Sequence, residues 1–275
     1  MEKRLAILLT IHNREIQTLE CLKRVYELIL PKDFLFDCYL VDDDSTDNSR
    51  ILIEENYPKV KIIDGNGDLF WNRGMHLAWK TAISFNNYDF YLWLNNDTFL
   101  FDGALFELIE CYKESNEDVL VCGATCDLTH STFTYGGYNL NGQTVIPNSN
   151  LQQCEIINGN IVLVSRSICK SIGILDPIFS HAIGDHEYGL RAIKKGFKIY
   201  TTRKYIGICE QNESHPKWCY SHISLIERFK SLYSPLANAH PFYFFIYEFR
   251  YFGIITAIKH FITIHLRALI PSLWK

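Results

Sequence analysis

The 275-residue sequence lacks a strong charge of either sign, and it lacks the cysteine spacing of a disulfide scaffold or a zinc site. Its 27 Lys and Arg residues nearly balance 31 Asp and Glu residues, which gives a formal net charge of −4. Nucleic-acid-binding proteins usually carry a basic face that displaces counterions from phosphates, so this composition gives no general reason to expect nucleic acid as a partner. The nine cysteines are odd in number and contain no C-x-x-C pair. They are typical of small buried hydrophobic residues in a reducing compartment.

Long apolar segments and several common catalytic motifs are also missing. No stretch of 18 residues is both apolar and free of charge, which disfavours a membrane span. The apolar run before His12 is too short for a secretory signal, so we expect a cytoplasmic protein. The Walker A, H-E-x-x-H and G-x-S-x-G motifs do not occur. What the chain does have is 48% hydrophobic and 14% aromatic residues, enough for a large buried core.

Short apolar runs alternate with helical patterns over the first 95 residues. Strands are predicted at 5–11, 36–44, 59–64 and 89–95, with helices at 18–30, 47–56 and 74–85. Runs that are apolar on both sides indicate a mostly parallel sheet flanked by helices, a Rossmann-like α/β fold. In such sheets ligands bind at the carboxyl ends of the strands.

Polar residues stand at these predicted strand ends. The four ends read Thr10-Ile11-His12-Asn13-Arg14, Asp42-Asp43-Asp44, Asp64-Gly65-Asn66-Gly67 and Asn95-Asn96-Asp97. Three of them carry carboxylates, which would repel a phosphate unless a divalent cation lay between, so a divalent cation is the economical hypothesis. Ser45 or Asp47 is expected to cap the following helix, which leaves the Asp42 region free to bind a base imide or ribose hydroxyls.

A second acidic segment, residues 184–197, reads GDHEYGLRAIKKGF and begins a predicted helix. Glu187 and Arg191 are spaced for a surface ion pair at i and i+4. Asp185, at the mouth of the helix, remains free to act as a base. The segment GNGDLF at 65–70 is not a dinucleotide fingerprint, because Phe70 replaces the third small residue.

Six segments in order, spanning roughly residues 4–215, resemble the family 2 inverting glycosyltransferases of the GT-A fold, in their rhamnosyltransferase-like bacterial form. TIHNR resembles the family's T-x-x-N-R, VDDDSTD resembles V-D-D-G-S-T-D, and LNNDTFLFDGAL places Asn95-Asn96-Asp97 where the D-x-D metal motif stands. NGDLFWNRG, the segment 157–177 and GDHEYGLRAIKKGF are similar to the other three motifs. Two positions depart from the family: Asn95 replaces the first acid of D-x-D, and Gly184 replaces the glutamate before the base.

The resemblance implies transfer of a hexosyl or deoxyhexosyl group from a UDP- or dTDP-sugar to a glycan or lipid-linked saccharide, in cell-surface polysaccharide synthesis. It implies Asp185 as the catalytic base and Asp97 as a ligand of Mg²⁺ or Mn²⁺, with His215 as a further metal contact. The implied nucleotide-sugar contacts are Thr10, His12, Asn13, Arg14, Asp42, Asp43, Asn66, Gly67, Trp71, Asn72, Asn95 and Asn96. The implied acceptor-side residues are Asn158, Gly159, Glu187 and Arg191.

Two other function classes remain open at this point. A non-catalytic nucleotide-sugar-binding or scaffold protein with the same fold is motivated by Asn95 and Gly184. A sugar nucleotidyltransferase is disfavoured, because the first strand is not followed by the glycine-rich loop that cradles a triphosphate.

The last forty residues differ in composition from a catalytic domain expected at 1–235. In the tail, 236–275, apolar residues at helical spacing predict one amphipathic helix, or two helices broken near Gly253. Its charges from residue 241 are Arg250, Lys259, Arg267 and Lys275 against Glu248 alone. Packing on the catalytic domain and lying at a membrane interface both account for this pattern. The aromatic residues with scattered Lys and Arg favour the inner face of the cell membrane.

Overall fold

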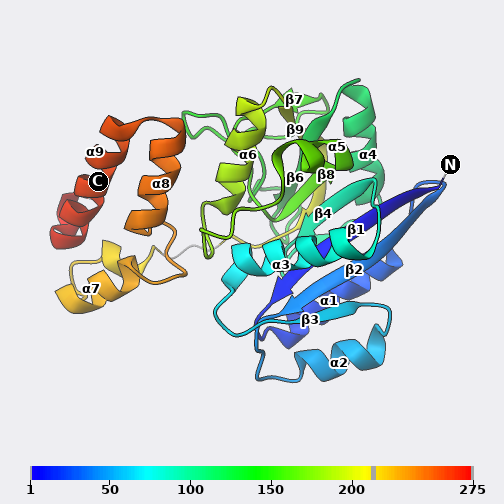
Figure 1. Ribbon diagram of the computed structural model, residues 1–275, viewed down its shortest axis with the longest axis horizontal. Helices are drawn as coiled ribbons and strands as arrows, with labels where there is room; N and C mark the ends of the chain where they lie inside the picture. The colour runs from blue at the N-terminus through cyan, green and yellow to red at the C-terminus, as the bar shows by residue number, and fades with distance from the viewer. Residues whose placement is uncertain (1, 212–214, 274–275) are drawn as a thin grey trace.

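The computed structural model describes residues 2–211 and 215–273, which form a central sheet flanked by helices (Figure 1). The first half contains β1 (Lys3–Ile11), α1 (Glu15–Glu27), β2 (Phe34–Asp42), α2 (Ser49–Asn56), β3 (Lys61–Asp64), α3 (Phe70–Phe85), β4 (Phe90–Leu94), β5 (Phe99–Leu100), α4 (Ala104–Glu114) and β6 (Val119–Cys126). The second half contains β7 (Gln152–Gln153), β8 (Ile161–Ser165), α5 (Arg166–Ile172), α6 (Gly184–Lys194), β9 (Lys198–Ile208), η1 (Lys217–Cys219), α7 (Leu225–Leu232), α8 (Pro241–Tyr251), α9 (Ile254–Leu269) and η2 (Pro271–Leu273).

The sheet has the strand order β3-β2-β1-β4-β8-β6-β9-β5, with β7 paired to β9. β3, β2, β1 and β4 are parallel, as the alternating pattern predicts. The other half is mixed, because β8 lies antiparallel to both β4 and β6. The predicted α/β fold is confirmed, with a sheet that is parallel only over part of its width.

Helices cover both faces of the sheet because the central strand is apolar on both sides. In β1, Leu5, Ile7 and Leu9 face the layer of α1, α2 and α4, while Ala6 and Leu8 face α3, α5 and α6. Each layer is a separate buried apolar cluster. All nine cysteines are free, and eight of them are buried as small core residues, as predicted; Cys219 is only partly buried.

The tail forms two helices, α8 and α9, that meet at Gly253, whose φ of 88° favours glycine. The predicted break near this residue is confirmed. Tyr247 of α8 packs into a buried cluster with Phe179 and with Leu190 of α6, so α8 is attached to the sheet-bearing part of the chain. α9 packs on α8 and α7 at the far left of Figure 1. The boundary at 235/236 stays a prediction.

None of the helices in residues 2–211 and 215–273 combines the length and apolar character needed to cross a membrane.

Candidate functional site

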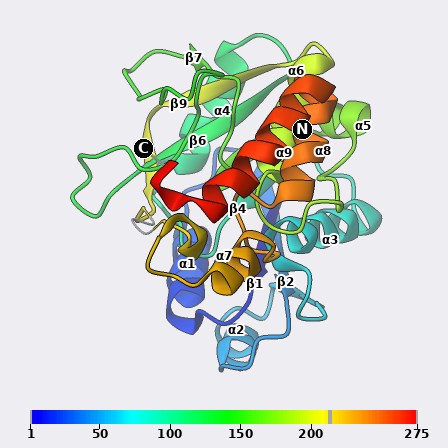
Figure 2. The same cartoon turned by 90° about the vertical axis from the view of Figure 1, so that its left-hand side faces the viewer.

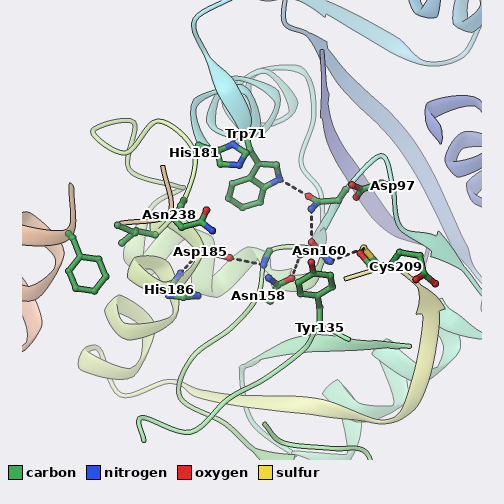
Figure 3. Close-up of a pocket in the computed structure, with 16 residues that line it drawn as sticks. Trp71, Asp97, Tyr135, Asn158, Asn160, His181, Asp185, His186, Cys209 and Asn238 are labelled. Atoms are coloured by element: carbon green, nitrogen blue, oxygen red, sulfur yellow. Dashed lines mark hydrogen bonds between the residues drawn. The ribbon is translucent and has the colours of Figure 1, made fainter. Parts of the chain in front are cut away.

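A cavity of about 390 Å³ lies beyond the carboxyl end of β4 (Figure 3). Six residues implied from the sequence line it: Trp71, Asn95, Asp97, Asn158, Gly159 and Asp185. They come from α3, from the turn after β4, from the segment before β8 and from the first turn of α6. The fold thus brings together residues that lie up to 114 positions apart in the sequence. Asp97 and Asp185 are exposed to the same cavity.

Asp185 is oriented by two backbone N–H groups. The amide of Gly159 donates to one carboxylate oxygen at 2.8 Å, and the amide of His186 donates to the other at 2.9 Å. Residue 159 must be a glycine for the Trp71 ring to keep its place, since a Cβ atom there would lie 2.4 Å from that ring. The carboxylate is partly buried, fixed in direction and directed to the cavity, as a general base must be.

Gly184, one of the two departures from the family pattern, has a steric cause. A Cβ atom at this position would lie 1.9 Å from Oδ1 of Asn72. The Asn72 side chain is fully buried and donates to the carbonyl oxygens of Asp176 and Phe179, each at 2.8 Å. Asn72 therefore shapes the loop that leads into α6. A glutamate at position 184 has no room while Asn72 holds this loop.

Asn95, the other departure, belongs to a chain of side-chain hydrogen bonds. Trp71 Nε1 donates to Asn95 Oδ1 at 2.6 Å, and Asn95 Nδ2 donates to Asn160 Oδ1 at 2.5 Å. Asn160 Nδ2 in turn contacts Cys209 Sγ at 3.2 Å, and Figure 3 shows these bonds running along the cavity from Trp71 to Cys209. Both ends of the Asn95 amide are therefore occupied within the protein. Asn95 positions the cavity wall.

Asp97 faces the cavity and forms an ion pair with Arg14, at 2.6 Å between Nη1 and Oδ2. Both side chains are more than a third exposed, Arg14 at 55% and Asp97 at 35%. The pair joins the carboxyl ends of β1 and β4, which are neighbours in the sheet. The two side chains put opposite charges beside the cavity. The guanidinium suits an anionic ligand, and the carboxylate suits a cation bound with it.

The carboxylate oxygens of Asp97 suit a hard divalent cation, which prefers oxygen ligands. Within residues 2–211 and 215–273, no group of three or more His, Cys, Asp or Glu side chains gathers into a protein-only cage. Mg²⁺ is commonly held by one or two carboxylates together with substrate phosphates. Asp97 therefore fits as a single protein anchor that acts together with a phosphate-bearing ligand.

Asp43 is committed to backbone hydrogen bonds. Its Oδ1 accepts from Gly67 N at 2.8 Å, and its Oδ2 accepts from Leu69 N at 3.0 Å and Phe70 N at 2.9 Å. The side chain is only 2% exposed. Gly67 and Phe70 both have positive φ values, of 84° and 56°, so this carboxylate stabilises a tightly bent loop. The implied nucleotide contact of Asp43 stays a prediction, and the structure gives the residue a loop-shaping position.

The end of β1 is tied to the loop after β2. Asn13 Oδ1 accepts from the amides of Thr46 and Asp47, and Asn13 N donates to Ser45 Oγ at 2.8 Å. Asp47 Oδ1 accepts from Ser49 N, the first residue of α2. The N-cap position is held by Asn48, so the predicted cap at Ser45 or Asp47 is wrong, and Ser45 Oγ accepts from Asn13 N instead. Asp42 accepts from Ser45 N at 3.0 Å. This loop is a preformed wall at the sheet edge.

The remaining implied nucleotide contacts lie outside the cavity lining. Thr10 packs against Gly74 of α3, and Asn96 is buried and donates to Thr18. His12 Nδ1 contacts the Asp43 carbonyl at 2.7 Å, and Asn66 caps its own turn by accepting from Asp68 N. His215, the implied further metal contact, also lies outside the cavity lining; it is exposed, with its ring 6.4 Å from that of Tyr220. Their implied roles stay predictions.

Glu187 and Arg191 pair as expected, at 2.9 Å, but Glu187 is buried instead of lying on the surface. Arg250 and Tyr251 of α8 also contact its carboxylate, at 3.5 and 2.7 Å. The pair borders a separate hollow between α6 and α8. The surface location was wrong because α8 covers this face of α6, a contact that no local spacing could reveal.

Several residues of the cavity are missed by sequence reasoning: Tyr135, Asn160, His181, His186, Cys209, Glu210, Asn238 and Phe244. Of these, His181 is notable because burial lowers its pKa and its Nδ1 has no hydrogen-bond partner among the described residues. The negative charge of Asp185 opposes this shift and the positive charge of Arg14 adds to it. Closeness in the sequence to residues already implied could have identified two of them, because His181 stands four residues before Asp185 and Asn160 stands two after Asn158.

Comparison with known proteins adds a family and a fold. The model of the family described as "Glycosyl transferase family 2" matches residues 6–173. No curated protein matches the sequence.

Solved structures that resemble this chain include the fragment 1–349 of S. aureus TarS in complex with UDP-GlcNAc, with a TM-score of 0.57, 14% identity, and coverage of 95% of this chain and 81% of that one. The mannosyltransferase PcManGT from Pyrobaculum calidifontis, in complex with GDP-Man and Mn²⁺, has a TM-score of 0.56, 14% identity, and coverage of 94% and 74%. GalNAc-T7 with UDP, GalNAc and Mn²⁺ has a TM-score of 0.60, 11% identity, and coverage of 84% and 48%. Against a longer TarS structure the chain spans only 39% of that chain. These likenesses show the GT-A fold.

Proposed function

Because the chain belongs to glycosyl transferase family 2, we propose that it is an inverting glycosyltransferase. It moves a hexosyl or deoxyhexosyl group from a UDP- or dTDP-sugar to a glycan or a lipid-linked saccharide. The proposed product belongs to the cell-surface polysaccharides. The observation that carries this proposal is the placement of Asp97 and Asp185 on one cavity.

Asp185 is the proposed general base. The acceptor hydroxyl gives its proton to the Asp185 carboxylate while its oxygen bonds to the anomeric carbon. The bond from that carbon to the diphosphate breaks on the opposite face, so the anomeric configuration inverts. The amides of Gly159 and His186 hold the carboxylate in one direction, which reduces the reorganisation needed for proton transfer.

The donor is proposed to lie along the carboxyl ends of β1, β2 and β4. Arg14 offers a guanidinium that can pair with the diphosphate, in the planar geometry that suits phosphate oxygens. The loop held by Asp43, residues 65–70, and the wall formed by Asn13 and Ser45 border this path. Trp71 supplies an aromatic ring at the cavity, fixed by its bond to Asn95.

Asp97 would hold Mg²⁺ or Mn²⁺ together with the diphosphate. When bound, such an ion offsets the negative charge that grows on the leaving diphosphate. PcManGT and GalNAc-T7 were solved with Mn²⁺, which supports the same class of ion here without deciding between the two.

A non-catalytic sugar-nucleotide-binding protein is the rival, and it rests on Asn95 and Gly184. The structure gives both residues local roles, since Asn95 supports Trp71 and Asn160 while Gly184 makes room for Asn72. Neither substitution removes Asp97 or Asp185 from the cavity. This favours turnover over binding alone.

The acceptor is proposed to be met at the inner face of the cell membrane, with the protein bound peripherally. Phe244 of α8 lines the cavity, so the tail helices are next to the acceptor side. A lipid-linked saccharide would reach the cavity from that side.

A donor screen tests the proposal. UDP-, dTDP- and GDP-sugars are added one at a time with Mg²⁺ or Mn²⁺, and thermal shift and release of nucleoside diphosphate are measured. A UDP- or dTDP-sugar should raise the melting temperature, and slow release should depend on the metal. Binding without release, under any acceptor offered, would support the rival. The absence of any thermal shift across the panel would contradict both.

A further inference from the structure

The helix α9 carries apolar side chains on two opposite faces, and only one of them is covered. Ala257, Ile264 and Ala268 are buried. Ile264 and Ala268 belong to a cluster with Trp218 and Leu232, and α9 packs on α8 and α7. Packing on the rest of the chain therefore accounts for one face of the helix. It leaves the second face without an explanation.

The second face is a stripe of large aliphatic residues. Its members, Ile255, Ile258, Ile262, Leu266 and Leu269, recur at helical spacing and are 43% to 82% exposed. Ile270 and Leu273 continue the exposed apolar character into η2. We call the five residues of α9 the outer stripe. Figure 2 shows α9 lying at the front of this side of the molecule, with α8 behind it. Contiguous apolar surface of this kind marks an interaction site.

The charged side chains of α9 itself are both basic. From Gly253 to Leu273 the sequence contains Lys259 and Arg267 and no Asp or Glu. Both basic residues are exposed. The nearest acid along the chain, Glu248, is 4% exposed and contacts His260 of α9. A helix with an apolar face, basic side chains and no acid of its own matches an anionic lipid surface.

We propose that the outer stripe of α9 is the surface by which this protein binds an anionic phospholipid membrane. The aliphatic side chains enter the boundary between headgroups and acyl chains, and Lys259 and Arg267 lie toward the lipid phosphates. A second copy of the chain fits less well. A two-fold symmetric contact through the same face would bring basic residues of both copies near one another, with no acid of α9 to pair with them.

This docking places the cavity near the lipid. α8 lies between α9 and the cavity, contributes Phe244 to the lining, and contacts α9 through the Phe244 and His260 rings at 6.3 Å. The inference gives the proposed membrane location a defined surface. It does not depend on the transfer chemistry, because lipid binding and donor binding use different residues.

Flotation with vesicles tests the docking. The full chain is mixed with vesicles of phosphatidylcholine containing phosphatidylglycerol, or of phosphatidylcholine alone, and the bound fraction is measured. The wild-type protein should float with the anionic vesicles and bind neutral ones at least several-fold less. The double variant Ile258→Asp and Ile262→Asp should lose at least tenfold in partitioning. Lys259→Gln should lose roughly fivefold, since one basic residue contributes about that factor at such a surface.

The matched control is Ile51→Asp on α2, which is 56% exposed and distant from α9 in Figure 1. It should float like the wild type. Equal flotation of the control and the α9 double variant, or no flotation of the wild type, would overturn the proposal. A dimer in light scattering that the double variant converts to a monomer would assign the stripe to a second copy instead.

Donor binding by the same variants separates this proposal from the proposed function. The double variant should keep the thermal shift produced by the nucleotide sugar, because α9 does not line the cavity. Lost flotation with intact donor binding supports the docking surface. Intact flotation with no donor binding by any variant, wild type included, would remove the proposed function and leave the docking surface standing.

Discussion

Two carboxylates at the sheet edge are used very differently by the fold. Asp43 accepts three backbone hydrogen bonds and is 2% exposed, so its carboxylate stabilises a bent loop. Asp185 accepts two backbone hydrogen bonds, yet remains partly exposed on a cavity. From the sequence the two look alike, because Asp43 directly follows the strand β2 and Asp185 lies at the start of the helix α6. The difference teaches that an acid at a ligand-binding edge can build the site or can react within it.

Asp97 stands between these two cases. Its one described partner is a partly exposed guanidinium, Arg14, and an ion pair of that kind contributes little to folding stability. Its carboxylate can therefore exchange partners when a ligand enters. The comparison predicts large stability effects at Asp43, large activity effects at Asp185, and binding effects at Asp97.

The largest expected effect is on turnover by Asp185→Asn. Removal of a positioned base costs on the order of 10² to 10⁴ in rate. The amide cannot take the acceptor proton, but it keeps the size of the side chain, so donor binding should stay near wild type. Its NH₂ group faces one of the two backbone N–H donors, so one charge-assisted hydrogen bond is lost and the melting temperature should fall. Steady-state rates with the donor found in the screen provide the measurement. Asp102→Asn, at an exposed position, is the control. A variant that keeps more than a tenth of the wild-type rate would contradict the role of Asp185.

The next effect is on stability, by Asp43→Asn. One oxygen becomes an NH₂ group that faces backbone N–H donors, so at least one charge-assisted bond is lost, at about 1.5–3 kcal/mol. The free energy of unfolding from a urea titration should fall by about that amount. Asp42→Asn, which has a single backbone partner in Ser45 N, should cost less. If the two variants unfold alike, Asp43 does not hold the loop.

A smaller effect is expected from Asn95→Ala. It leaves Trp71 Nε1 and Asn160 Oδ1 without their partner, and the loss of two net hydrogen bonds of about 1 kcal/mol each predicts at most roughly a thirtyfold fall in kcat/KM. Trp71 fluorescence should shift as the indole loses its acceptor. Asn87→Ala, at an exposed position, should leave both unchanged. Unchanged kcat/KM in Asn95→Ala would show that the cavity wall does not need this bond chain.

The smallest effect concerns pH and His181. Because burial lowers the pKa of His181 in the folded state, the unfolded chain takes up a proton first as the pH falls below about 6.5. The folded state therefore loses stability below that pH, by about 1 kcal/mol over one pH unit at most. His181→Gln, which cannot titrate, should show a flatter dependence of unfolding free energy between pH 7 and 5.5. Parallel curves for the two proteins would mean that His181 titrates normally.

Much of the parallel half of the sheet could be predicted from the sequence, because its signals are local. β1 is a continuous apolar run, polar residues follow it at once, and Gly253 marks the break between α8 and α9. The antiparallel strand β8 could not be placed, since its pairing with β4 joins residues about 70 positions apart. Strand order of this kind depends on contacts that no local pattern encodes.

The site was predictable by residue type more than by geometry. Asp97 and Asp185 follow recognisable patterns and do line one cavity. The commitment of Asp43 to backbone amides and the clash that keeps residue 184 a glycine are visible only in three dimensions. Glu187 was misjudged for the same reason, because α8 buries it from a distant part of the chain.

Calorimetric titration of UDP and dTDP with Mn²⁺ tests the central claim most directly, with wild type, Asp97→Asn and Asp185→Asn compared at one pH. The account predicts that Asp185→Asn binds the nucleotide as the wild type does, while Asp97→Asn binds at least tenfold more weakly. Equal binding by all three proteins, or weakened binding by Asp185→Asn alone, would contradict the division of this cavity into a donor side at Asp97 and an acceptor side at Asp185.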